Sequence, residues 1–149
     1  MKELHDRPIG IFQKNFLSIV MTSFIPEKGL FLDDFLKVRN KIATKYKDNV
    51  KELSFQQIPD YVSKHSYMMF FALAENQQIR NKYLDHLRAN QVDARISWLP
   101  LHNQPVNTKL NNNVYTKSDK IYNNSLTLPI YNSMTDDEIK FVLNTCKNV

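Results

Sequence analysis

The chain has 149 residues, of which 42% are hydrophobic and 23% are charged, and its formal net charge is +5. This length suits one domain with a single core, and this composition excludes both wholesale disorder and a membrane protein. The basic residues are scattered along the chain, which favours a solvated surface over nucleic-acid binding and is compatible with a phosphate-bearing substrate.

The cysteine content and the N-terminal region bear on the cellular compartment. Cys146 is the only cysteine, so the chain allows neither an intramolecular disulfide nor a multi-cysteine zinc site. It lies on the apolar face of a predicted helix, where core packing is favoured over nucleophilic work. The apolar run that begins at Phe16 is too short to span a bilayer, and no cleavage pattern follows it. We therefore expect a cytoplasmic protein.

The first half of the chain alternates helical and strand patterns. Apolar residues at helical spacing predict an amphipathic helix over roughly 30–48. The mixed segment 49–64 indicates a connection that could include a short strand. The aromatic and apolar run 66–73 predicts a strand covered on both faces. Asn76 is suited to cap a second helix, which ends near Asn90.

The second half contains the longest polar stretch. A strand is expected around 94–99, followed by a long loop over 103–124 and another strand over 125–130. A capping box formed by Thr135 and Glu138 then begins a final helix. This order of elements predicts an α+β domain with helices packed on a small sheet.

His102 is the most suggestive candidate for function. It stands between Pro100 and Pro105, which stiffen the backbone and present the imidazole on a loop that leaves a strand. Two interpretations remain open: His102 contacts a ligand, or it forms hydrogen bonds that lock the loop. For Trp98, on the preceding strand, a place in the core is favoured over a stacking platform.

Other residue patterns give little support for catalysis. The four histidines, among them the surface or boundary residue His86, lack metal-ligand spacing and have no carboxylate cluster beside them. Lys64 precedes a strand in a polar connection, which makes it a weak candidate for a Schiff-base lysine. Gly10 and Gly29 are the only glycines, so no glycine-rich phosphate loop can be built.

Five segments of the chain, taken together and in order, carry a family resemblance. They are FLKVRNKIATKY (35–46), HSYMMFFAL (65–73), IRNKYLDHLRANQVDAR (79–95), WLPLHNQP (98–105) and NSLTLPIYNSMTDDEIKFVLNTC (124–146). In this order they resemble the C-terminal domain of the DegT/DnrJ/EryC1/StrS family, the nucleotide-sugar aminotransferases that depend on pyridoxal phosphate (PLP).

The resemblance implies a fold and a division of labour. Residues 30–149 would form the family's small domain, with a mostly antiparallel sheet, and residues 1–29 could be a remnant of the connection to a large domain. In the family, the large domain binds PLP and carries the Schiff-base lysine. The chain would therefore be an isolated or truncated small domain without a cofactor or a catalytic residue of its own. In the complete enzyme, an amino group is transferred to a keto-sugar nucleotide.

The resemblance also implies which residues meet the substrate. The loop of His102 would face the active-site cleft and help to shape the sugar pocket, with Trp98 and Arg95 as further substrate-binding candidates. Lys64 corresponds to a surface lysine. Gln91 replaces an expected glycine, so Asn90 or Gln91 must supply the left-handed turn residue.

One element of the family is missing from its expected place. In the family, a glycine-asparagine-x-arginine element reaches the cofactor phosphate of the partner subunit. Asn15 could be a remnant of this element, but Leu17 stands where the arginine would be.

A second hypothesis is a non-catalytic module. In this interpretation the domain complements a separate PLP-binding domain, associates with a second copy of itself, or binds a sugar nucleotide without converting it. An exposed apolar patch would support complementation or self-association. Nucleic-acid binding ranks third, and a membrane partner is not expected.

Overall fold

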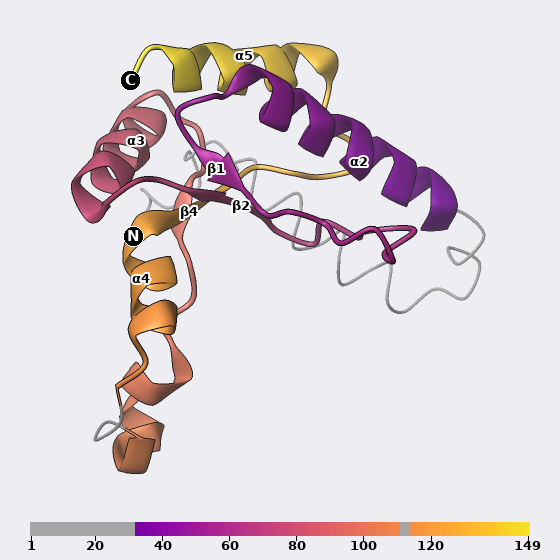
Figure 1. Ribbon diagram of the computed structural model, residues 1–149. Coiled ribbons are helices and arrows are strands. Elements are labelled where there is room, and N and C mark those ends of the chain that lie inside the picture. Colours follow the sequence, from indigo (N-terminus) through magenta and orange to yellow (C-terminus); the bar gives the residue numbers. More distant parts are fainter. Residues whose placement is uncertain (1–31, 111–113) are drawn as a thin grey trace, which may run out of the picture.

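A computed structural model of the chain describes residues 32–110 and 114–149 (Figure 1). The α-helices are α2 (Leu32–Asn49), α3 (Gln77–Ala89), α4 (Thr116–Asn124) and α5 (Asp136–Lys147). The strands are β1 (Ser54–Phe55), β2 (Phe70–Leu73), β3 (Arg95–Ile96) and β4 (Ser125–Leu128). Two 3₁₀ segments, η2 (Leu101–Asn103) and η3 (Pro105–Leu110), precede α4.

The four strands form one antiparallel sheet in the order β1-β2-β4-β3. The central strands β2 and β4 pair over four residues, from Phe70 opposite Leu128 to Leu73 opposite Ser125. The edge strands β1 and β3 each pair over two residues. This sheet confirms the predicted α+β class, including the mostly antiparallel arrangement and the short strand in the connection 49–64.

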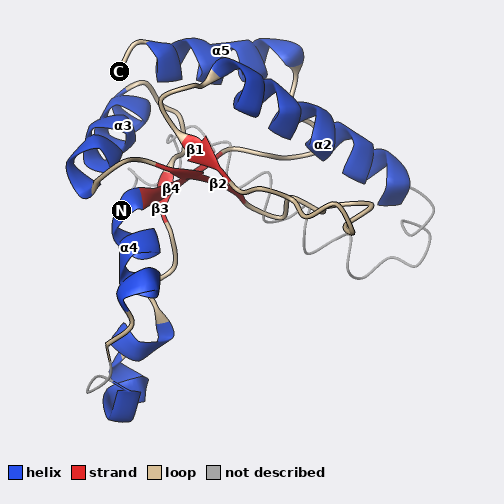
Figure 2. Ribbon diagram, viewed as in Figure 1, coloured by secondary structure: helices blue, strands red, loops and turns tan. Residues whose placement is uncertain are grey.

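The helices cover the sheet unequally. Figure 2 shows α2, α3 and α5 gathered on one side of the sheet, while α4 and the two 3₁₀ segments extend away from it. We call this extension (η2, η3 and α4) the arm. All four residues of β4 are buried, and no residue of β2 is exposed. Residues of α2, α3, β4 and α5 are among the most completely buried apolar residues, including Ile42, Tyr46, Leu87, Leu126, Val142 and Cys146.

Tyr46 joins α2 to the segment that follows β4. Its side chain is completely buried, and its hydroxyl donates a 2.8 Å hydrogen bond to the carbonyl oxygen of Pro129. Its ring lies 5.3 Å from that of Phe70, a distance typical of favourable aromatic pairs. Burial raises the pKa of the Tyr46 hydroxyl well above its ordinary value, so the group remains a hydrogen-bond donor. The hydroxyl therefore satisfies a carbonyl that water does not reach.

The helix starts follow the local sequence signals. The side chain of Asn76 accepts a 2.9 Å hydrogen bond from the backbone amide of Ile79, as a helix cap does. At α5, Thr135 accepts from the amide of Glu138, and the Glu138 carboxylate accepts from the amide of Thr135. Both predicted caps are confirmed.

Gln91 supplies the left-handed residue after α3. Its φ of 62° lies in the region that favours glycine. The amide of Gln91 donates to the carbonyl of Arg88, and the amide of Val92 donates to that of Leu87. These bonds end the helix and redirect the chain towards β3. The prediction that Asn90 or Gln91 takes this conformation is confirmed at Gln91.

The two strands flanking α3 are shorter than predicted. Tyr67 has a φ of 41°, and its amide donates to Nδ1 of His65. The chain therefore turns at Tyr67, and β2 begins only at Phe70. On the other side of α3, β3 pairs with β4 only at Arg95 and Ile96, so the chain leaves the sheet well before residue 99.

The predicted loop over 103–124 is wrong, because this stretch contains most of the arm, including α4. The sequence of α4 is polar, and its N-cap Tyr115 makes no side-chain capping bond. Local signals for this helix are therefore weak. It contacts α3, and the Asn124 side chain at its C-terminal end donates to the carbonyl of Glu75. Tertiary contacts stabilise a helix that the local pattern does not announce.

Replacing Tyr46 with Phe removes the hydroxyl and leaves the Pro129 carbonyl unsatisfied in the core. We expect the free energy of unfolding to fall by about 1–2 kcal/mol. Urea unfolding with an unchanged m-value measures this loss. Tyr61→Phe is the matched control, because Tyr61 is 88% exposed, and it should not change stability. Equal effects of the two substitutions would contradict the role assigned to Tyr46.

Replacing Gln91 with Gly removes a side chain from a left-handed position. We expect a gain of about 0.5–1 kcal/mol, because the relief of backbone strain exceeds the added freedom of the unfolded chain. Gln91→Ala keeps the Cβ atom and should give no such gain. Thermal unfolding of the two variants and the parent chain tests this, and a destabilised glycine variant would show that Gln91 contributes through its side chain.

Candidate functional site

His102 lies in η2 and is held against α4. Its Nε2 atom lies 2.8 Å from Oδ1 of Asp119. Because a carboxylate only accepts hydrogen bonds, the protonated Nε2 is the donor. The side-chain amide of Asn103 donates to the same carboxylate oxygen at 3.0 Å, and the Tyr115 ring lies 4.5 Å from the imidazole. His102 itself is buried.

This arrangement supports the interpretation that His102 locks its loop, with a carboxylate as the acceptor. The hydrogen bond joins η2 to α4 across 17 residues of chain. It occupies one ring nitrogen and fixes the tautomer. Contact between His102 and a substrate remains a prediction.

Asp119, Asn103 and Tyr115 were missed by the sequence reasoning, which placed all three in a loop. One signal was available, because Tyr115 and Asp119 are four residues apart and share a face once the segment is helical. That spacing places both next to the imidazole. Without the knowledge that residues 116–124 form a helix, the spacing had no meaning.

Trp98 is not in the core, contrary to the favoured interpretation of its strand. It is 70% exposed. The reason is the early end of β3, since the chain leaves the sheet after Ile96 and carries Trp98 into solvent. Leu99 and Leu101 are also exposed, so apolar side chains cluster along the segment that leads to His102. A large exposed indole is a suitable surface for binding.

Arg95 lies at the start of the same segment, on the edge strand β3. Its Nε and Nη2 atoms lie 3.0 and 3.3 Å from the two carboxylate oxygens of Asp93. This two-point pair orients the guanidinium. One segment therefore carries the three predicted substrate-binding residues, Arg95, Trp98 and His102. It begins in the edge strand β3 and ends in η2, which contacts α4 through the His102–Asp119 hydrogen bond. The structure brings His102 to Asp119, and it leaves Trp98 open to solvent.

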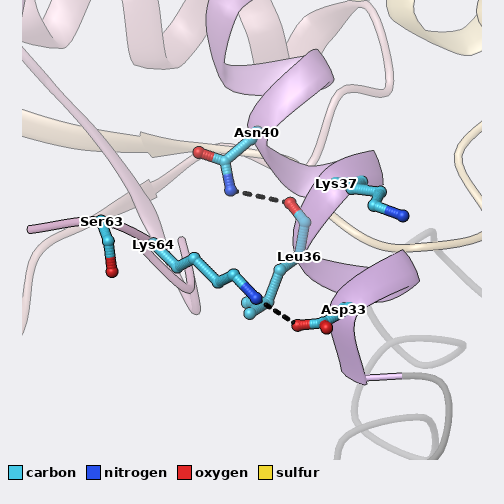
Figure 3. Close-up of a pocket in the computed structure, with 6 residues that line it drawn as sticks. All are labelled: Asp33, Leu36, Lys37, Asn40, Ser63 and Lys64. Atoms are coloured by element: carbon cyan, nitrogen blue, oxygen red, sulfur yellow. Dashed lines mark hydrogen bonds and ion pairs between the residues drawn. The ribbon is translucent and has the colours of Figure 1, made fainter.

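A hollow lies between the N-terminal part of α2 and the segment before β2 (Figure 3). It encloses about 240 Å³. Lys64 reaches Asp33 across it with an Nζ to Oδ1 distance of 2.6 Å. The hydrogen bond from Lys64, followed by its charge, lowers the pKa of the Asp33 carboxyl. Figure 3 shows Lys37 directed away from this ion pair.

These residues do not fit PLP. Lys64 is exposed and paired with Asp33, in agreement with its interpretation as a surface lysine. A Schiff-base lysine needs an environment that disfavours its charged form, and no lysine among those whose burial is described is buried. The lysines whose burial is described therefore do not suit covalent attachment of the cofactor.

The remaining candidate groups are structural. Burial raises the pKa of the Cys146 thiol to about 12, so the thiol stays protonated within the core, as the sequence analysis favoured. In the part of the chain that the structure describes, no cluster of three or more His, Cys, Asp or Glu side chains is placed to hold a metal ion. Within the same residues, no helix is long and apolar enough to cross a membrane.

The described residues form a small α+β domain with one antiparallel sheet. The sequence profile of the DegT/DnrJ/EryC1/StrS aminotransferase family matches residues 30–147, most of the chain. The chain belongs to this family, as its ordered motifs predicted.

Individual relatives agree with this assignment. The spore coat polysaccharide biosynthesis protein SpsC of Bacillus subtilis is 24% identical over 134 residues, which cover 79% of this chain and 33% of SpsC. The aminotransferase TlmJ from Streptoalloteichus hindustanus shares the fold with a TM-score of 0.69 and 19% identity, over 79% of this chain and 32% of TlmJ. Spr1654 from Streptococcus pneumoniae, in its pyridoxamine phosphate (PMP) form, gives a TM-score of 0.68 with 17% identity over 79% and 31% of the two chains. The chain spans about a third of the length of the curated relatives it matches.

Replacing Asp119 with Ala should free the arm without unfolding the domain. The substitution removes the acceptor of His102, and we expect local opening of η2 and α4 to become easier by about 1 kcal/mol, or roughly fivefold faster amide exchange there. Hydrogen exchange resolved by residue measures this, with α2 and α5 unchanged. Asp137→Ala removes a well-exposed carboxylate and serves as the control. Equal exchange in both variants would exclude the lock.

Proposed function

We propose that this chain acts as the small domain of a sugar aminotransferase of the DegT/DnrJ/EryC1/StrS family and does not catalyse transamination by itself. The observation that carries the proposal is the match of residues 30–147 to the family, together with the absence of a buried lysine among the lysines whose burial is described. The polysaccharide role in the name of SpsC and the PMP form of Spr1654 support the sugar substrate and the cofactor of the complete enzyme.

In the complete enzyme, the amino group would pass to a keto-sugar nucleotide. Bound PLP supplies the electron sink for this chemistry, and the protein binds and orients the substrate. The contribution of this chain would be the segment from Arg95 to His102. The exposed Trp98 ring offers an apolar face to a sugar ring. The His102–Asp119 bond would hold that segment in one position.

A complementing module is the second candidate, and the exposed apolar residues of the arm favour it. Leu101, Val106 and Ile121 are all exposed, and Trp98 lies at the base of the arm. Apolar side chains gathered on one projecting element are typical of protein interfaces. The partner would be a separate PLP-binding domain or a second copy of this chain.

A PLP absorbance titration tests the proposal. The purified chain alone should show no internal aldimine band in the region of about 410–430 nm. A PLP-binding large-domain polypeptide added to it should show the band together with transamination. Trp98→Ala in this mixture should lower kcat/KM by about tenfold, the loss of one good aromatic contact. Lys64→Ala is the control and should leave both signals unchanged.

Two results would overturn this proposal. An aldimine band in the chain alone that vanishes in Lys64→Ala would make the protein a small PLP enzyme in its own right. Transamination by the mixture that is insensitive to Trp98→Ala and to His102→Ala would show that the segment from Arg95 to His102 does not meet the substrate.

A further inference from the structure

Arg80 is a buried charge for which the described residues provide no counterpart. It lies on α3 and is only 3% exposed, on the same face as the core residues Tyr83, Leu84 and Leu87. Its Nε and Nη1 atoms are buried and have no hydrogen-bond partner in the part of the chain that the structure describes. None of the ion pairs among residues 32–110 and 114–149 includes Arg80.

Such a group is costly to leave unsatisfied. The Arg80 side chain shares a helix face with the apolar core residues of α3, and an arginine side chain has several N–H donors but no acceptor. Buried arginines are ordinarily paired or hydrogen-bonded, because removal of their hydration is expensive. An acceptor that is not among the described residues would remove this cost.

Two other arginines of the domain show how the fold satisfies this side chain elsewhere. In the part-buried Arg39, Nε donates to the Asn132 side chain at 2.8 Å and Nη1 donates to the carbonyl of Tyr67 at 3.0 Å. Arg88, on the same helix as Arg80, donates from Nε to the carbonyl of Ala94 at 3.0 Å. Arg80 is the most deeply buried of these three arginines, and the described residues offer its Nε and Nη1 no acceptor. The lack of an acceptor among these residues is therefore particular to Arg80.

The beginning of α3 adds two features that favour an anion beside Arg80. The first turn of α3 contains no acidic residue, and the nearest carboxylate in sequence, Glu75, lies before the cap. Within the turn itself, no side chain compensates the positive end of the helix dipole. Asn76 caps the amide of Ile79, and the amides of Gln77 and Gln78 have no acceptor within the helix. Arg80 follows Gln77 and Gln78 within the first turns of α3. Because the Cα–Cβ bonds of a helix tilt towards its N-terminus, we expect the Arg80 guanidinium on the side of these amides.

We propose that Arg80 and the first turn of α3 form a binding site for a small oxyanion of the phosphate class. A guanidinium and free amides at a helix start are donors that match phosphate oxygens. The site is separate from the segment between Arg95 and His102, and it does not depend on the proposed aminotransferase role. The net charge of +5 favours the approach of such an anion.

Thermal unfolding of the full 149-residue chain tests the site, with inorganic phosphate as the probe and sodium chloride of equal ionic strength as the reference. A ligand at ten times its dissociation constant raises the unfolding temperature of a chain of this size by about 4 °C. We expect this rise in the parent chain and its loss in Arg80→Met. Arg88→Met, which removes the same charge from the same helix, should keep the rise.

Amide chemical shifts provide a measurement that does not depend on the folding of the Arg80 variant. Titration of phosphate into the parent chain should shift the amides of Gln77 and Gln78 in a saturable way. A rise in unfolding temperature that persists in Arg80→Met, or no rise in the parent chain, would overturn the proposal. Saturable shifts confined to other amides would also overturn it.

A carboxylate of the chain itself is the competing source of an acceptor. The acidic residues outside the described part are Glu3, Asp6 and Glu27. The combined variant E3Q, D6N and E27Q should respond to phosphate as the parent chain does. If only this variant responds, the chain's own carboxylate fills the site and the free-anion proposal is wrong.

Discussion

The pairing of β2 with β4 is the constraint on which the rest of this domain depends. It aligns residues 70–73 with 125–128, two segments more than fifty positions apart, and buries all of β4. The start of α3 is tied to this strand pair, because the amide of Ala74 donates to the carbonyl of Asn124. The C-terminal end of β4 is connected to α2 by Tyr46, whose hydroxyl donates a hydrogen bond to the carbonyl of Pro129. The pairing of β2 with β4 therefore fixes where α2 and the start of α3 lie relative to the sheet.

The position of the arm depends on how briefly β3 pairs with the central strand β4. Because β3 pairs with β4 over two residues only, the chain departs from the sheet early and returns through α4 directly into Ser125. Within the arm, the hydrogen bond from His102 to Asp119 joins η2 to α4. The chain from β3 to β4 is attached to the sheet at both ends and contains this hydrogen bond, so it can hold Trp98 in a defined position in solvent. The short edge strand β3 thus leaves the Trp98 side chain exposed to solvent.

Exposed ion pairs and the buried Arg80 have different effects on the stability of this domain. Exposed ion pairs such as Lys64 with Asp33 contribute little to stability, since water screens them. They also show that the lysine is not suited to covalent cofactor chemistry. Arg80 is the opposite case, because a buried guanidinium without an acceptor is costly. The exposed pair explains why Lys64 is an ordinary surface lysine, and the buried Arg80 is the basis of the anion site proposed above.

The sequence by itself determined the features whose hydrogen bonds are local. The caps at Asn76 and Thr135, the left-handed turn at Gln91, the α+β class and the family membership could all be predicted, because each rests on residues three or four positions apart or on motif order. Only the tertiary structure decided that residues 116–124 are helical, that Trp98 is exposed and that Arg80 is buried. Burial depends on where a strand leaves the sheet and which helix packs beside it, and these contacts join residues far apart in the chain.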